Sequence, residues 1–376
     1  MRQITNCCSV GVTKIFCNFA ATTPSININH GVNKSGNTTT KGKLLSSALK
    51  YVVPLAVSVG LCYLLFTGVD FGRMLDIIAR ECRFGWIALA LVISVLSHVF
   101  RAMRWRIQLQ ALGIAVPLRA LVLSIFGTYA VNLVFPRLGE VWRTGYIAQR
   151  QRASFTEVFG SMVAERLCDT LTVLVLTVAA FLLARAQLVA YLSQNSELYA
   201  TVMSWVASPW LWCGVAAVVA VAWWFLSHRS ANGVVLKVQD LARSLWHGFA
   251  VIATMPGKGR WLVLTVAIWG CYFTQLFVAF YAFDFTAAVV SDYGIVAVLV
   301  AFVLSSISMG VPSNGGIGPW QWAIIFALGI YGLESTSAGA FANLVLGTQT
   351  LLLIVLGIIT FVAIAIEKRS AADNSK

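Results

Sequence analysis

Long apolar segments constrain the fold of this 376-residue chain more than any other feature of its sequence. A helix needs about 20 predominantly apolar residues to cross the hydrocarbon core of a bilayer. Hydrophobic residues make up 59% of the chain and charged residues only 11%, whereas a soluble domain averages roughly 45–50% and 25%. We therefore expect an all-α polytopic membrane protein. Six stretches can serve as full spans, near 50–67, 86–106, 158–184, 209–227, 261–283 and 340–366.

Two further apolar segments are short or interrupted. Segment 121–135 ends at Pro136, and segment 295–331 is broken in the middle by the residues 312–318. Interruption by Pro and Gly is typical of the helices that form transport sites in membranes. We interpret both segments as re-entrant or broken-helix hairpins, which gives six to eight helices in all. A reading of 293–331 as two full spans fits the sequence equally well.

The placement of basic residues predicts the orientation in the membrane. With the N-terminus inside, 22 of the 27 Lys and Arg residues fall on inside segments and 4 fall on outside segments. Such a bias is typical of cytoplasmic loops. We expect a multi-pass protein of the inner (plasma) membrane with both termini in the cytoplasm. The bias also accounts for most of the net charge of +13, so no nucleic-acid partner is expected.

The two interrupted segments resemble each other. Segments 132–140 and 308–316 both place Pro-x-x-Gly after an apolar run, and each half of the chain has the order span, span, hairpin, span. Because the second half starts from the opposite side, we predict inverted repeats, at about 44–190 and 205–366. Pro-x-x-Gly is also a common turn pattern, which is the simpler alternative. The predicted hinges are Pro136, Gly139, Pro312, Gly315, Gly316 and Gly318.

Three charged residues lie within the apolar stretch 158–184. Glu165 and Asp169 are four residues apart and share one helix face, with Arg166 about 100° away. Each such charge costs roughly 2.5–3.5 kcal/mol at the centre of a membrane helix on insertion scales. We expect these three residues to line an intramembrane polar cavity. The alternatives are side chains that reach the interface, or ion pairs that only lock helices together.

A second charged cluster follows Pro136. Arg137 and Arg143 flank Glu140, which can meet Arg143 if a helix starts at Gly139. A helix N-terminus favours anions, and arginine matches the geometry of phosphate. This pattern predicts a site for a lipid phosphate, and an interface helix with snorkelling arginines is the alternative.

A third cluster lies at the end of the second predicted span. Arg101 and Arg104 share a helix face, and Trp105 follows them. Basic pockets between helices bind anionic head groups. The alternative is an anchor that fixes topology, with an interfacial tryptophan.

Other chemistry has little support in the sequence. There is no phosphate-binding loop of ATPases, and the His and Cys residues have no metal-ligand spacing. We expect no cofactor, no metal and no catalytic residue. Residues 1–43 contain no acidic residue and are rich in Asn, Thr and Ser, which predicts a disordered cytoplasmic extension. The transmembrane domain is expected at 44–366, and a cytoplasmic tail at 367–376.

Four motifs in order carry a family resemblance. They are Arg101-x-x-Arg104-Trp105, Pro136-x-x-Gly139-Glu140-x-x-Arg143, Glu165-Arg166-x-x-Asp169 and the turn from Pro312 to Gly318. Over about 50–366 the chain resembles the lysylphosphatidylglycerol synthase transmembrane region, a flippase-like family. In the bifunctional multiple peptide resistance factor, a similar region flips an aminoacylated lipid that a separate soluble domain makes. Few residues follow the last span here, so the resemblance implies the translocating part without the synthase domain.

The leading hypothesis is a lipid flippase or transporter that works without ATP. It would move an anionic phospholipid or a polyprenyl-phosphate-type lipid between leaflets, with Arg101, Arg104 and Arg143 on the phosphate. One alternative is a membrane transferase with Glu165 or Asp169 as base. Another is a non-catalytic partner of an envelope-biosynthesis enzyme. The lipid, the direction and coupling of transport, and the oligomeric state stay open.

Overall fold

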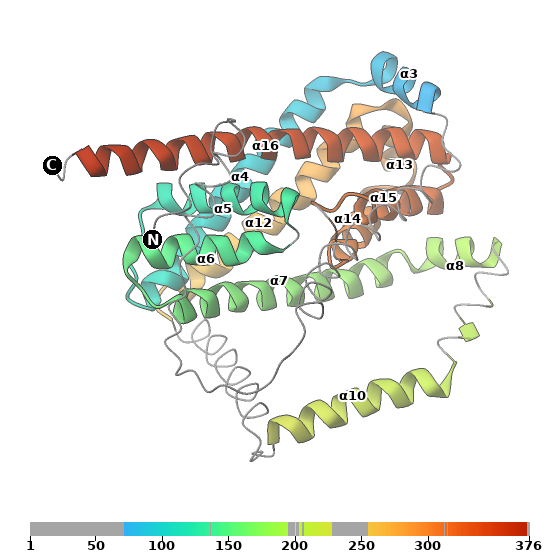
Figure 1. Ribbon diagram of the computed structural model, residues 1–376. Coiled ribbons are helices and arrows are strands. Elements are labelled where there is room, and N and C mark those ends of the chain that lie inside the picture. Colours follow the sequence, from blue (N-terminus) through green and yellow to red (C-terminus); the bar gives the residue numbers. More distant parts are fainter. Residues whose placement is uncertain are drawn as a thin grey trace, which may run out of the picture.

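The computed structural model describes residues 71–135, 137–194, 200, 203–204, 207–227, 255–311, 313 and 315–373. This part of the chain forms twelve α-helices and one short 3-10 helix, without a β-strand (Figure 1). The predicted all-α class is therefore correct for these residues. The helices are α3 (Phe71–Glu81), α4 (Phe84–Ala111), α5 (Leu118–Val134), α6 (Leu138–Gln151), α7 (Phe155–Leu183), α8 (Arg185–Gln194), α10 (Pro209–Ser227), α12 (Lys258–Ala279), η1 (Phe280–Ala282), α13 (Asp284–Tyr293), α14 (Ile295–Ser308), α15 (Pro319–Ile330) and α16 (Ser335–Asp373).

Four helical segments in the described ranges are long and apolar enough to cross a membrane: α4, α7, α12 with η1, and α16. They match the predicted spans near 86–106, 158–184, 261–283 and 340–366. The prediction at 209–227 coincides with the helix α10, which is not among these four, so its role as a span stays a prediction. The predicted span at 50–67 and the extension at 1–43 lie outside the described residues. Helix α16 runs on to Asp373, into the segment that was predicted as a tail.

Large apolar side chains cover the outer faces of these helices. Such a surface would be unfavourable in water, because it exposes contiguous apolar area, and it suits contact with lipid tails. Figure 1 shows α16 above and α7 below the helices α4, α5, α6 and α12, with α10 further below α7. The exposed apolar residues of α7 include Leu167, Leu171, Leu174 and Val178, and those of α16 include Leu351, Val355, Ile358 and Val362.

Both predicted hairpins are present as pairs of packed helices. In the first, α5 packs on α6 across the connection 135–137; in the second, α14 packs on α15 across 309–318. Helix α5 has 17 residues and α15 has 12, and both are shorter than the roughly 20 residues that a full crossing needs. The inverted relation between the two halves stays a prediction.

The second hairpin is preceded by a sharp bend that the sequence pattern did not reveal. Helices α13 and α14 meet at an angle of 112°. Gly294 lies between them with a φ of 69°, a left-handed conformation that glycine adopts without a Cβ penalty. The bend sets the start of α14 at Ile295, where the second interrupted segment was expected to begin.

The tips of the two hairpins touch each other. The Arg137 guanidinium donates a hydrogen bond of 2.6 Å from Nη2 to the carbonyl oxygen of Gly310. A Cβ atom added to Gly315 would lie only 2.8 Å from Leu133 Cδ2. Gly315, Gly316 and Gly318 all have positive φ, so the second tip turns sharply enough to approach the first.

Two apolar clusters form the core, and α4 and α7 run through both. One cluster contains Ala90 of α4 and Ala180 of α7, together with residues of η1 and α13–α16. The other contains Trp105 of α4 and Val158 of α7, together with residues of α5 and α6. Between the two clusters, each of these helices carries buried polar residues. The polar part of the core therefore lies near the middle of both long helices.

Candidate functional site

One face of α4 supplies most of the polar residues in the core. Their spacing of three or four residues places them on successive turns of the same face. This face is packed against α5, α7 and α12, so all of these side chains are buried. They are Ser94, Ser97, His98, Arg101, Arg104, Trp105 and Gln108.

Glu165 on α7 is the centre of the charged cluster and is fully buried. Its Oε1 atom accepts hydrogen bonds from Arg101 Nε at 2.9 Å and from Arg104 Nη2 at 3.1 Å. Its Oε2 atom accepts one from Arg143 Nη2, on α6, at 3.2 Å. A single carboxylate thus connects arginines from two other helices.

Asp169, one turn further along α7, forms the second anionic point. Its Oδ1 atom accepts a hydrogen bond of 2.8 Å from Arg104 Nη2, and its Oδ2 atom lies 4.0 Å from Arg101 Nη2. Two neutral residues also contact the arginines: Arg101 donates a hydrogen bond of 2.8 Å to the Tyr129 hydroxyl, and Arg104 donates one of 3.3 Å to Thr265 Oγ1. The Asp169 side chain keeps 19% of its surface exposed, so the cluster opens on this side.

Two tryptophans hold arginines through their ring faces. The guanidinium carbon of Arg143 lies 4.3 Å from the centre of the Trp105 ring, and that of Arg104 lies 5.4 Å from the Trp261 ring. A cation over an aromatic face is attracted by the ring quadrupole, most strongly where water is absent. Trp105 is itself fixed by a hydrogen bond of 3.0 Å from its Nε1 to Ser161 Oγ.

The cluster has more positive than negative charge. Three arginines form ion pairs with two carboxylates, so the directly paired groups carry one more positive than negative charge. Some N–H groups also lack a hydrogen-bond partner in the described structure: Arg101 Nη2, Arg104 Nε and Arg143 Nε. Unmatched donors and charge are costly in a buried site. An anion that carries several acceptor oxygens would satisfy both deficits, and a phosphate has this form.

Burial argues against two of the alternatives drawn from the sequence. Arg101 and Arg104 do not form an interfacial anchor with Trp105, because their relative exposures are 5% and 0%, and Trp105 is also fully buried. The alternative for Arg143 was an interface helix at the point where the first hairpin returns to the surface. In the structure Arg143 has a relative exposure of only 1%. It pairs with Glu165 on another helix rather than with Glu140 on its own.

The remaining candidates lie around the cluster rather than in it. Glu140 is half-buried, and its Oε2 atom accepts a 3.4 Å hydrogen bond from Asn132. Arg137 lies at the hairpin tip, and the described residues offer Arg166 no ion pair. Gly139 is buried in the first hairpin. Two predicted hinges, Pro136 and Pro312, lie outside the described residues.

Sequence reasoning missed the neutral part of the site. Tyr129 comes from α5, and Trp261 and Thr265 come from α12; the sequence patterns singled out no residue of either helix as a charged or polar site residue. His98 is also buried, and neither of its ring nitrogens has a hydrogen-bond partner among the described residues. The offsets of three residues from His98 to Arg101 and four from Arg101 to Trp105 could have included His98 in the α4 face. No group of three or more His, Cys, Asp or Glu residues suited to a metal occurs within the described ranges.

The fold and the site together define a class: a helical membrane protein with an arginine–carboxylate cluster buried between its long helices. The chain belongs to the family described as the lysylphosphatidylglycerol synthase TM region, whose model matches residues 51–357. That match contains the whole cluster and both hairpins. Searches of curated proteins and of solved structures gave no match.

Proposed function

We propose that this protein is a lipid flippase or transporter that moves an anionic phospholipid or a polyprenyl-phosphate-type lipid between the leaflets of the inner membrane. Membership of a family tied to membrane lipids supports a lipid substrate. The observation that carries the proposal is the surplus of buried arginine over carboxylate, with unpaired N–H donors on all three guanidinium groups.

The cluster would bind the phosphate of the head group by exchange of ion-pair partners. Glu165 holds the three arginines in place when no lipid is bound, because it contacts all of them. Asp169 contacts Arg104 and is partly exposed, so a phosphate can approach from this side and replace it. The exchange keeps each arginine paired throughout, which avoids the large cost of an isolated buried charge.

The hairpins would provide the path. The ends of short helices leave backbone polar groups unpaired at membrane depth. This is tolerated only where protein or a water-filled cavity, and not lipid, surrounds these groups. The hydrogen bond from Arg137 to the Gly310 carbonyl joins the two hairpin tips. When this bond is formed the tips would block the path of the lipid, and when it breaks they would open that path. The proposed orientation, with both termini in the cytoplasm, follows from the distribution of Lys and Arg.

Translocation can be tested in proteoliposomes that contain fluorescent phosphatidylglycerol or phosphatidylcholine. We expect the wild-type protein to accelerate the exchange of phosphatidylglycerol above empty vesicles, and to act less on zwitterionic phosphatidylcholine. The variant Arg143→Gln removes one phosphate donor, and we expect it to slow the exchange at least about tenfold, the effect of losing roughly one charge-assisted hydrogen bond.

Arg106→Gln is the matched control, because Arg106 is an exposed arginine of the same bundle. It should exchange lipid at the wild-type rate. Wild-type protein that moves neither phosphatidylglycerol nor a labelled polyprenyl phosphate above the background of empty vesicles would refute the proposal.

A further inference from the structure

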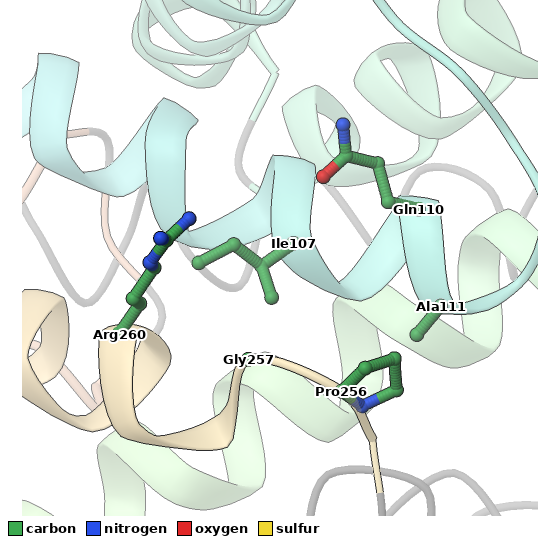
Figure 2. Close-up of a pocket in the computed structure, with 6 residues that line it drawn as sticks. All are labelled: Ile107, Gln110, Ala111, Pro256, Gly257 and Arg260. Atoms are coloured by element: carbon green, nitrogen blue, oxygen red, sulfur yellow. The ribbon is translucent and has the colours of Figure 1, made fainter.

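A cavity of about 310 Å³ lies between the end of α4 and the start of α12, away from the charged cluster. Figure 2 shows Ile107 in its middle, between the Arg260 guanidinium and the backbone at Pro256 and Gly257. Gln110 and Ala111 of α4 complete the lining. We propose that this cavity is a docking site for the phosphate group of a lipid head group, occupied before the lipid reaches the buried cluster. This inference rests on the proposed function and names an entry site for it.

Arg260 is the only charged residue among the six that line the cavity. Arg260 is exposed and makes no ion pair in the described part of the chain. A phosphate on Arg260 would therefore meet no competing carboxylate from the other five lining residues, none of which is charged.

The backbone at the start of α12 adds further donors. The helix begins after Gly257, which has a φ of 88°, and no side chain caps its first N–H groups. Free N–H groups and the helix dipole favour an anion at such an end. Gly257 lines the cavity, so these donors lie at its wall.

Two buried polar groups lie between the cavity and the charged cluster, and neither is satisfied. Gln108 is 3% exposed and Trp261 is 7% exposed, yet the Gln108 amide atoms and Trp261 Nε1 have no hydrogen-bond partner among the described residues. Gln108 is three residues before Ala111 and four after Arg104, so all three share one face of α4. Trp261 follows Arg260, and its ring contacts the Arg104 guanidinium.

Both groups lie on the helices that connect the cavity to the charged cluster. On α4, Gln108 lies between Ala111 and Arg104, which are about 10 Å apart at 1.5 Å per residue. On α12, Trp261 lies between Gly257 and Thr265, which accepts a hydrogen bond from Arg104. In the proposed orientation the cavity is at the cytoplasmic end. We therefore expect a head group docked at Arg260 to reach Arg104 by moving past Gln108 and Trp261.

Binding to the full-length protein in detergent would test the site. Titration calorimetry with two probes, dihexanoyl phosphatidylglycerol below its micellar concentration and inorganic phosphate, separates the two sources of the phosphate group. We expect Arg260→Gln to weaken binding of the lipid about tenfold, as for the loss of one charged donor. Trp261→Phe keeps the ring but removes the N–H group, and should have a smaller effect. Arg106→Gln removes the same charge from a neighbouring exposed position and should bind like the wild type.

The outcomes are distinct. Loss of lipid affinity alone assigns the site to the head group, and an equal loss for inorganic phosphate assigns it to a free phosphate. No binding of either probe, or equal losses in Arg260→Gln and Arg106→Gln, overturns the site. Translocation measured on the same preparations separates the two proposals. A wild-type protein that binds through Arg260 but moves no lipid refutes only the function. If the wild-type protein moves lipid, and the Arg260→Gln variant has the same exchange rate and the same lipid affinity as the wild type, only the site is refuted.

Discussion

At the scale of single residues, Glu165 has the largest electrostatic role. It is fully buried and accepts a hydrogen bond from each of three arginines. Asp169 contacts two of the same arginines, but its side chain is 19% exposed, so it is less completely desolvated than Glu165. Removal of one partner from a buried ion pair is more costly than the pair is stabilising, because the other charge stays buried and unpaired.

Glu165→Gln and Asp169→Asn should therefore differ in stability. We expect Glu165→Gln to lower the free energy of unfolding by about 3–5 kcal/mol, the cost of breaking a buried charge pair. The loss in Asp169→Asn should be smaller, because Arg104 keeps its bond to Glu165. Unfolding of the detergent-solubilised protein by sodium dodecyl sulfate measures both. Equal losses in the two variants would show that Glu165 is not the centre of the cluster.

At the scale of elements, the first hairpin depends on the close approach of α5 and α6. Gly139 allows this approach: a Cβ atom at this position would lie 2.2 Å from the Thr128 carbonyl oxygen and 2.7 Å from Asn132 Oδ1. The Gly139 N–H group also donates a 2.7 Å hydrogen bond to Asn132 Oδ1. The hairpin brings Arg143 to the cluster, so its packing decides whether the site can form.

Gly139→Ala should consequently separate the two helices. The expected loss is about 1–3 kcal/mol, as for other overpacked interiors, together with a fall in lipid exchange. Gly160→Ala in α7 is the control, because no atom lies within 4 Å of its added Cβ. It should be neutral or stabilise the helix by up to about 1 kcal/mol. Thermal unfolding of both variants in the same detergent gives the comparison, and a Gly139→Ala protein as stable as the control would contradict the packing.

At the scale of the whole molecule, exposed ion pairs connect helices at both ends. Arg119 and Arg150 approach Glu367 at one end, at 3.6 Å and 2.8 Å. Arg73 pairs with Glu334 at the other end, at 3.0 Å. Exposed pairs of this kind contribute little stability. Their positions matter because they mark the two ends that the membrane would separate.

Chemical labelling of cysteines can decide which end faces the cytoplasm. In a variant without native cysteines, Asp292→Cys and Ser154→Cys place exposed thiols at opposite ends of the bundle. A membrane-impermeant maleimide should label position 292 in intact cells, and position 154 only after the cells are permeabilised. The reverse pattern would invert the proposed orientation and place the Arg260 cavity outside.

The sequence by itself determined the class of fold and the positions of the long apolar helices. It also predicted where both hairpins break. These are local properties, because a helix in lipid satisfies its own backbone hydrogen bonds and needs only sufficient apolar length. Sequence spacing likewise singled out Glu165, Arg166 and Asp169 as charges within a membrane span, and Arg101, Arg104 and Arg143 as candidate ligands of a head group near the membrane surface. The bend at Gly294 and the neutral residues of the site had no comparable signal.

Only the tertiary structure decided how those charges pair. Arg104 and Glu165 are 61 residues apart in the sequence, and Arg104 and Thr265 are 161 apart. Their contacts depend on how α4, α7 and α12 pack, which no periodicity within one helix specifies. Glu140 lies three residues before Arg143 in the sequence and was the expected partner. In the packed structure Arg143 instead forms its ion pair with Glu165. The sequence placed the three arginines of the cluster near the membrane surface, whereas the structure buries them around Glu165. Each buried arginine needs an anionic partner, because an unpaired charge away from water is costly.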